Sequence, residues 1–143
     1  MHRFIFFFAA ILFLSCKKNN PPADTCKVSE TTIPGTYLKT AVKYKASSSA
    51  AEEDWFSGLQ ECEKDDPYEL KPGGTVVVGD GPTVCPGPPP PGTVTAWSLS
   101  ADKKTLNLDA VYTILSFDCK TIVLQEKDSR VIGDIRTVTF VKQ

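Results

Sequence analysis

Short runs of alternating apolar and polar residues, separated by turn signals, constrain the fold of this chain more than any other feature. The clearest run is AWSLSADKKTLNL, whose turn we place at residues 101–104. Leu99 then faces Leu106, and Trp97 faces Leu108, with all four side chains on one face. Serine, threonine and asparagine occupy the positions between them. This period of two predicts an antiparallel hairpin that buries one face against a core.

The same pattern recurs on both sides of this hairpin. Residues 62–85 predict a hairpin around the turn KPGG, where proline presets the backbone and the glycines are free to adopt positive φ. Residues 111–128 predict another hairpin, with a turn near residues 118–121. The residues expected to face each other across this turn are Leu115 with Leu124 and Phe117 with Ile122.

Two further strands are expected near the ends of the domain, at residues 33–45 and 135–143. In the second, the alternating Arg136 and Lys142 suit a strand that seals an edge. A short helix or helical loop is expected within residues 46–62. Because no connection is long enough for parallel pairing, we predict an all-β fold, an up-and-down barrel of about eight antiparallel strands with one short helix after the first strand. Such a barrel is either filled by side chains or holds one small ligand.

The N-terminal apolar run, residues 4–14, is followed by Cys16 and the polar stretch KKNNPPADT. Its length suits a signal peptide and is too short to cross a bilayer as a helix; a short membrane or core helix is the alternative. The ending FLSC resembles the lipobox of bacterial lipoproteins, which implies cleavage before Cys16 and acylation of its amine and thiol. We therefore predict a lipoprotein signal peptide at residues 1–15, a lipidated flexible tether at 16–33 and a barrel domain at 34–143.

The chain has five cysteines, an odd number for an exported protein. If Cys16 carries lipid, four remain, and they allow three pairings. Cys62 and Cys85 lie almost equally far from the centre of the KPGG turn, so the fold-back predicts their disulfide and leaves Cys26 to pair with Cys119. The rival interpretation, a four-thiolate zinc site, lacks any CxxC spacing and does not suit an oxidising compartment.

Residues with catalytic chemistry are scarce. His2 is the only histidine and Met1 the only methionine, so removal of the signal peptide also removes histidine-based nucleophile systems and the usual haem ligands. A formal charge of −1 gives no reason to expect nucleic-acid binding. We therefore predict a protein that is not an enzyme and has no cofactor or metal.

One acidic cluster could still carry chemistry. We interpret it as a solvated loop, with a calcium site or a glycosidase carboxylate pair as the alternatives. The cluster comprises Glu61, Glu63, Asp65 and Asp66, joined by Asp80 in the calcium interpretation.

Several soft motifs follow one another through the domain. They are GTY at residues 35–37, CEKDDPY at 62–68, WSLSADKKTL at 97–106, the hairpin run 113–124 and TVTF at 137–140. Together they resemble the lipocalin-like domains of small bacterial lipoproteins that are common in Bacteroidetes. The resemblance implies a lipocalin-like β-barrel. It does not imply a ligand, because fold alone does not determine function.

Apolar residues on the expected inner face define a candidate cavity. An open cavity would bind a small hydrophobic ligand. A filled barrel would act through its surface, with the segments CPGPPPPG and AEEDWF as contact points. The residues expected to line the cavity are Tyr37, Tyr68, Leu70, Trp97, Leu99, Leu106, Leu108, Leu115, Phe117, Leu124 and Phe140.

These observations predict a lipid-anchored, non-catalytic protein of the cell envelope that binds a small hydrophobic ligand. The alternative is a filled-barrel lipoprotein that acts as a scaffold, an inhibitor or an accessory subunit. The expected partner is the membrane, reached through the lipid on Cys16. Because lysines and asparagines rather than an acidic run follow Cys16, we expect a periplasm-facing position, in the outer membrane.

Overall fold

The structure is a computed structural model that describes residues 26–86 and 93–143. The predicted signal peptide, Cys16, most of the tether and most of CPGPPPPG lie outside these residues. The strands are β1 (Gly35–Lys45), β2 (Glu53–Asp54), β3 (Pro67–Lys71), β4 (Thr75–Val78), β5 (Thr93–Ala96), β6 (Ser98–Leu99), β7 (Thr105–Asn107), β8 (Val111–Phe117), β9 (Thr121–Lys127) and β10 (Ile135–Lys142), and the helix is α1 (Glu61–Lys64).

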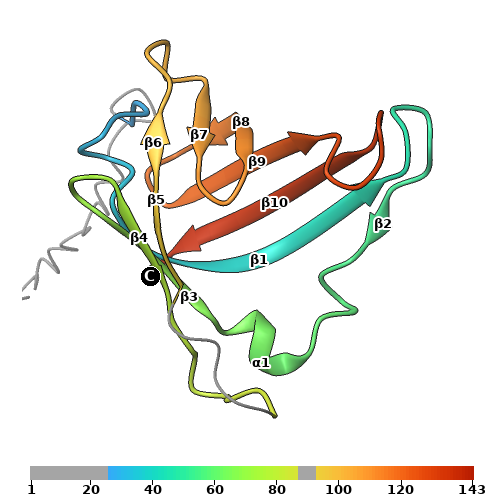
Figure 1. Cartoon of the computed structure of the whole chain (residues 1–143), viewed down its shortest axis with the longest axis horizontal. Coiled ribbons are helices and arrows are strands. Elements are labelled where there is room, and N and C mark those ends of the chain that lie inside the picture. Colours follow the sequence, from blue (N-terminus) through green and yellow to red (C-terminus); the bar gives the residue numbers. More distant parts are fainter. Residues whose placement is uncertain (1–25, 87–92) are drawn as a thin grey trace, which may run out of the picture.

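The strands form one antiparallel sheet that curls into a nearly closed up-and-down barrel (Figure 1). The strand order is β5-β4-β3-β1-β10-β9-β8-β7-β6, with β2 paired to β1 beside this path. Although β5 and β6 end the order on opposite sides, only Trp97 separates them in the chain. They therefore act as one strand that joins the two edges, and the nine strands of the path occupy eight positions around the barrel. The predicted all-β antiparallel barrel is confirmed.

The register of the hairpins agrees with the prediction except at two points. Leu99 pairs with Leu106, and Phe117 pairs with Ile122, as expected. A bulge in β8 makes Ile114 the partner of Leu124, so the predicted pairing of Leu115 with Leu124 is wrong. A bulge adds one residue to a strand and shifts the side chains that follow to the other face.

The second difference concerns Trp97, which was expected to face Leu108 across the hairpin. The β6–β7 ladder stops at Ser98, and the backbone N–H of Trp97 instead donates to the carbonyl of Gly74 at 2.7 Å. This bond follows from closure of the barrel, because the chain leaves the edge beside β4 at this residue and joins the edge beside β7. Gly74 has φ +89°, and an added Cβ would come within 3.0 Å of the Trp97 carbonyl, so the close approach requires glycine.

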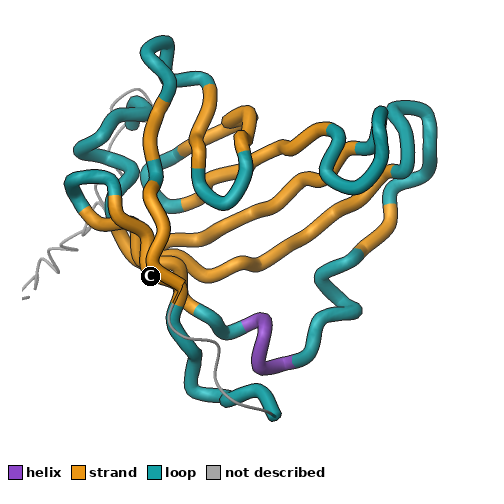
Figure 2. The backbone as a smooth tube through the Cα atoms, in the orientation of Figure 1, coloured by secondary structure: helices purple, strands orange, loops and turns teal. Residues whose placement is uncertain are grey.

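The long connection from β1 to β3 contains one short helix after the first strand, as predicted, but α1 begins only at the end of the range 46–62 in which it was expected (Figure 2). In α1 the Glu63 carboxylate accepts a hydrogen bond from the backbone N–H of Gln60 at 2.8 Å, which satisfies a donor at the helix start. The preceding residues form turns and the two-residue strand β2. The backbone N–H groups of Trp55 and Phe56 both donate to the carbonyl of Val42, which attaches this connection to β1.

Both predicted disulfides are present. Cys26 and Cys119 are joined with their Cα atoms 5.5 Å apart, and Cys62 and Cys85 with theirs 5.1 Å apart. The first links residues 93 positions apart and ties the start of the described chain to the β8–β9 turn. The second closes the β3–β4 hairpin region, as its near symmetry about the KPGG turn predicted.

Candidate functional site

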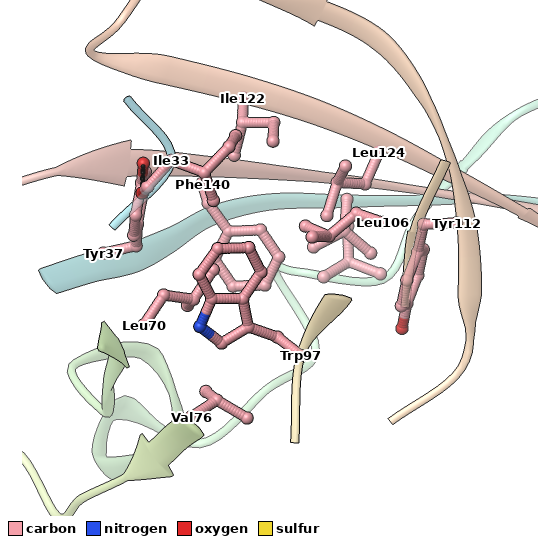
Figure 3. Packing of buried hydrophobic residues seen from close by; sticks show 12 residues of the cluster. Ile33, Tyr37, Leu70, Val76, Trp97, Leu106, Tyr112, Ile122, Leu124 and Phe140 are labelled. Carbon is pink, nitrogen blue, oxygen red and sulfur yellow. Dashed lines mark hydrogen bonds between the residues drawn. The ribbon is translucent and has the colours of Figure 1, made fainter. Parts of the chain in front are cut away.

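The interior of the barrel has two different ends. At one end, side chains from opposite walls point toward one another and fill the space (Figure 3). The void that remains is about 10 Å³, at the lower limit of what a single water molecule needs. This packed end, by which we mean the residues around that void together with Trp97 of the same buried cluster, therefore has no room for a ligand. The void itself is lined by Ile33, Tyr37, Tyr68, Leu70, Leu106, Leu108, Ile122, Leu124 and Phe140.

Buried polar atoms at the packed end are satisfied by the backbone. The Tyr37 hydroxyl donates to the carbonyl of Ile33 at 2.6 Å, and the Trp97 Nε1–H donates to the carbonyl of Lys71 at 2.9 Å. Burial raises the pKa of Tyr37 to about 12, so its hydroxyl stays protonated at neutral pH. These bonds leave neither group free for a ligand and mark this end as structural core.

The other end contains a cleft of about 550 Å³. It lies between the inner faces of β1, β8 and β10 on one side and residues 54–59 on the other. A volume of this size is within the range of small-molecule sites. The lining is formed by Lys39, Val42, Asp54, Trp55, Ser57, Gly58, Leu59, Tyr68, Leu108, Asp109, Tyr112, Ser129, Arg130, Arg136, Val138 and Phe140.

The eleven residues predicted to line a cavity fall into four places. Three residues line both the cleft and the small void, at the boundary between the two ends: Tyr68, Leu108 and Phe140. Those buried in the core, most of them around the small void, are Tyr37, Leu70, Trp97, Leu106 and Leu124. Two half-buried residues that pack against this core are Leu99 and Phe117. Leu115 is 49% exposed, because the β8 bulge turns it outward, and its assignment to the cavity is wrong.

Charged residues on the inner face are the main feature that the sequence interpretation missed. Arg136 was expected to seal an edge, yet it lines the cleft. It shares its face of β10 with Val138 and Phe140, which are buried. The alternation of β10 itself carried this signal, because side chains two apart in a strand point the same way.

Arg136 is the centre of a polar network inside the cleft. Its Nη2 lies 2.6 Å from Glu126 Oε2 and donates to the Tyr112 hydroxyl at 2.9 Å. The Tyr112 hydroxyl donates in turn to Asp109 Oδ1 at 3.0 Å. The Arg136 and Glu126 side chains are only 31% and 14% exposed, so this ion pair is partly shielded from water. Desolvation, followed by the nearby Asp109 carboxylate, raises the pKa of Tyr112, and the hydroxyl therefore remains a donor.

Trp55 and Arg130 form the wall opposite β10, and Trp55 rests on Tyr44 of β1. The rings of Tyr44 and Trp55 stack with centroids 3.8 Å apart, and the Arg130 guanidinium lies 4.6 Å from the Trp55 centroid. The Tyr44 hydroxyl donates to Asp134 Oδ2 at 3.2 Å. The stack therefore joins the β1–β3 connection to the β9–β10 loop across the mouth of the cleft. Trp55, the largest apolar side chain of the AEEDWF segment, is therefore already packed between Tyr44 and Arg130.

Asp134 organises the β9–β10 loop. Its buried carboxylate accepts hydrogen bonds from the backbone N–H groups of Ser129 at 2.6 Å, Arg130 at 2.9 Å and Val131 at 3.2 Å. Desolvation raises the pKa of this carboxyl, but the hydrogen bonds from the loop backbone outweigh it and lower the pKa below its ordinary value. The loop that carries Arg130 is thus positioned by an ionised side chain.

The acidic cluster beside Cys62 makes local structural contacts. Asp65 accepts a hydrogen bond from the Thr83 N–H at 2.9 Å, and Asp66 accepts one from the Gly81 N–H at 3.2 Å. Glu61 pairs with Lys64 at 2.7 Å. Across residues 26–86 and 93–143, no three side chains of the metal-binding types gather into a possible ion site. These carboxylates therefore connect the start of β3 to the loop that follows β4.

Comparisons with known proteins add no assignment, because no family model, curated protein or solved structure matches the chain. In the part of the chain that the structure describes, no helix has both the length and the apolar character needed to cross a membrane.

Proposed function

We propose that this protein is a lipid-anchored, lipocalin-like protein of the cell envelope that binds a small hydrophobic molecule in the cleft and does not catalyse a reaction. The observation that carries this proposal is the cleft of about 550 Å³ at one end of a barrel whose other end is filled. A small barrel packed throughout would leave no such volume.

The floor of the cleft supports an apolar ligand. Val42, Val138 and Phe140 lie side by side on the inner faces of β1 and β10, and Leu108 and Leu59 add apolar surface from other segments. Covering such surface with an apolar molecule is favourable by about 25 cal/mol for each Å² removed from water. The volume and the floor together suit a compact hydrophobic body more than an extended polar chain.

The proposed location rests on the cysteines and the N-terminal sequence. Two disulfides within the described residues fit an oxidising compartment outside the cytoplasm. The FLSC sequence supports an acyl anchor on Cys16. The direct test is Cys16→Ser, which we expect to release the protein from the membrane fraction; a variant that stays there at the wild-type level would refute the anchor.

Binding is tested with N-phenyl-1-naphthylamine, a neutral apolar dye whose fluorescence rises in apolar surroundings. We expect the mature protein to bind it at one saturable site. Val138→Trp should greatly weaken binding, because the larger side chain projects into the cleft. The matched control is Thr139→Trp, which introduces the same ring one residue away on the opposite face of β10 and should leave binding unchanged.

Three results would refute the proposed site. The first is an absence of dye uptake by the folded wild type. The second is equal binding by both tryptophan variants. The third is native mass spectrometry of protein isolated from its membrane that consistently shows no bound organic molecule. Circular dichroism of each variant confirms that a loss of binding does not come from unfolding.

A further inference from the structure

The acidic residues of the cleft are already paired. Asp54 Oδ2 lies 3.7 Å from Lys43 Nζ, and Asp54 Oδ1 accepts a hydrogen bond from the Phe56 N–H at 3.1 Å. Asp109 accepts the hydrogen bond of the Tyr112 hydroxyl. A cationic ligand would therefore have to compete with existing partners for both carboxylates.

Two of the basic residues differ from these acids. Within residues 26–86 and 93–143, neither Lys39 nor Arg130 has a carboxylate within 4.0 Å. Each lies over an aromatic ring instead. Lys39 Nζ is 5.5 Å from the centroid of Tyr68, and the Arg130 guanidinium is 4.6 Å from that of Trp55. A cation over a ring keeps its net charge, and so does Asp109, whose partner is a neutral hydroxyl. The two unpaired cations outnumber this one carboxylate, so the net charge of the cleft lining is positive.

Arg136 has donors that its partners do not use. A guanidinium carries five N–H groups, and both of its recorded contacts, with Glu126 and Tyr112, use the same nitrogen, Nη2. Its Nε is buried and has no acceptor among the described residues. Because Nε has almost no exposed surface, the donors open to a ligand are those of the Nη groups, and such donors beside a cleft suit a carboxylate or a similar anion.

The two arginines lie at the same end of the cleft. Arg136 is the partner of Tyr44 across the β1–β10 ladder, and Tyr44 stacks on Trp55, over which Arg130 lies. From Arg136 the inner face of β10 continues with Val138 and Phe140, toward the packed end. The cleft therefore has a cationic rim and an apolar floor along a single direction.

We propose that the ligand is an amphipathic organic anion, with an apolar body on Val138 and Phe140 and an anionic group held by Arg130 and Arg136. This inference rests on the proposed function, because it names the class of molecule that the cleft takes. Lys39 provides a third positive charge farther along β1, across from Phe140, which favours the same sign of ligand.

The test compares three ligands with the same ten-carbon chain: decanoate, decanol and decyltrimethylammonium, each titrated against bound N-phenyl-1-naphthylamine at about pH 8, where the carboxylate is ionised. We expect decanoate to bind about tenfold more tightly than decanol, which corresponds to one charge-assisted hydrogen-bond pair. This advantage should shrink at about 1 M NaCl, where the Debye length falls to about 3 Å.

Variants locate the anionic group. Arg130→Gln should weaken decanoate binding about threefold and leave decanol unchanged, whereas Lys120→Gln, an equal loss of charge on the exposed β8–β9 turn, should change neither. Because Arg136→Gln alone would leave Glu126 unpaired in a shielded position, the test uses Arg136→Gln together with Glu126→Gln. This double variant should also lose the preference for decanoate.

The outcomes separate the two proposals. If decanol binds as tightly as decanoate, or the trimethylammonium compound binds best, the anionic class is refuted while the hydrophobic site stands. If neither the dye nor any of the three compounds binds, the proposed function and this inference both fail. A decanoate preference that survives in both arginine variants would refute the assigned position of the anionic group.

Discussion

The packed end and the cleft end use the same two strands, β1 and β10, and differ in what faces them. At the packed end the inner face carries Tyr37, whose hydroxyl bonds a backbone carbonyl, and the opposite wall supplies Trp97 and Leu106. At the cleft end the inner face carries Tyr44 and Arg136, and the opposite wall is the connection around Trp55. The alternation of apolar and polar residues along β1 and β10 determines which side chains point inward. Whether these side chains form a packed core or line a cleft depends on the segment that faces them.

The change of wall has a simple cause in the topology. β3 pairs with β1 only from Gly35 to Leu38. Farther along, the same edge of β1 pairs with β2 at just two positions, Lys43 and Tyr44. A regular strand therefore gives way to a loop halfway along β1. A loop delivers fewer side chains into the interior than a strand does, which is why a cleft remains there.

The largest effect is expected from opening the packed end. Leu124 is completely buried, so Leu124→Ala should lower the free energy of unfolding by about 2–5 kcal/mol through lost apolar burial and a new cavity. Urea denaturation measures the loss. The control is Leu115→Ala on the outward bulge, expected to cost under about 1 kcal/mol. Similar losses at the two sites would contradict the assignment of Leu124 to the core and Leu115 to the surface.

The cleft end should be the more sensitive to acid, because Asp134 positions its loop. Its pKa is lower in the folded chain than the unfolded value of about 3.9, so the ionised carboxylate stabilises the fold above that value. This contribution is lost as the pH falls through the folded pKa. As the pH is lowered, we expect dye binding to be lost first. The far-ultraviolet circular dichroism signal of the sheet should be lost only at a lower pH.

Asp134→Asn separates this effect from general acid unfolding. The variant should be less stable than wild type at neutral pH, by less than Leu124→Ala, and its stability should depend less on pH below about 4. If wild type and variant lost dye binding along the same pH curve, Asp134 would not be the group that supports the cleft.

A smaller effect is expected from the network inside the cleft. Tyr112→Phe removes the hydroxyl that connects Arg136 to Asp109 and should cost about 1 kcal/mol of stability. Because the ring is kept, binding of a neutral dye should change little. Tyr68→Phe makes the same chemical change elsewhere in the cleft and serves as the control in urea denaturation. An equal or larger loss in Tyr68→Phe would show that the Tyr112 bonds contribute nothing.

Regular patterns in the sequence were sufficient for most of the fold. The pairing of Leu99 with Leu106 follows from alternation and turn position, and the Cys62–Cys85 bond follows from symmetry about KPGG. The error at Leu115 has a different origin. A bulge inserts one residue without a compositional signal of its own, so alternation counted from the turn fails beyond it.

The site was less predictable because it depends on packing between distant segments. The inward position of Arg136 could be read from its spacing to Val138, but its partner Glu126 lies on another strand. The wall at Trp55 belongs to a connection with little regular structure, and only its stacking on Tyr44 places it over the cleft. No periodic pattern specifies such a contact.

The two tryptophans of the chain provide the most direct test, because Trp97 lies at the packed end and Trp55 in the cleft. The measurement is fluorine NMR of mature protein labelled with 5-fluorotryptophan, with the two signals assigned through Trp55→Phe. Titration with N-phenyl-1-naphthylamine should move the Trp55 signal and leave the Trp97 signal in place. A shift of the Trp97 signal alone, or equal shifts of both, would contradict a barrel with one packed end and one binding end.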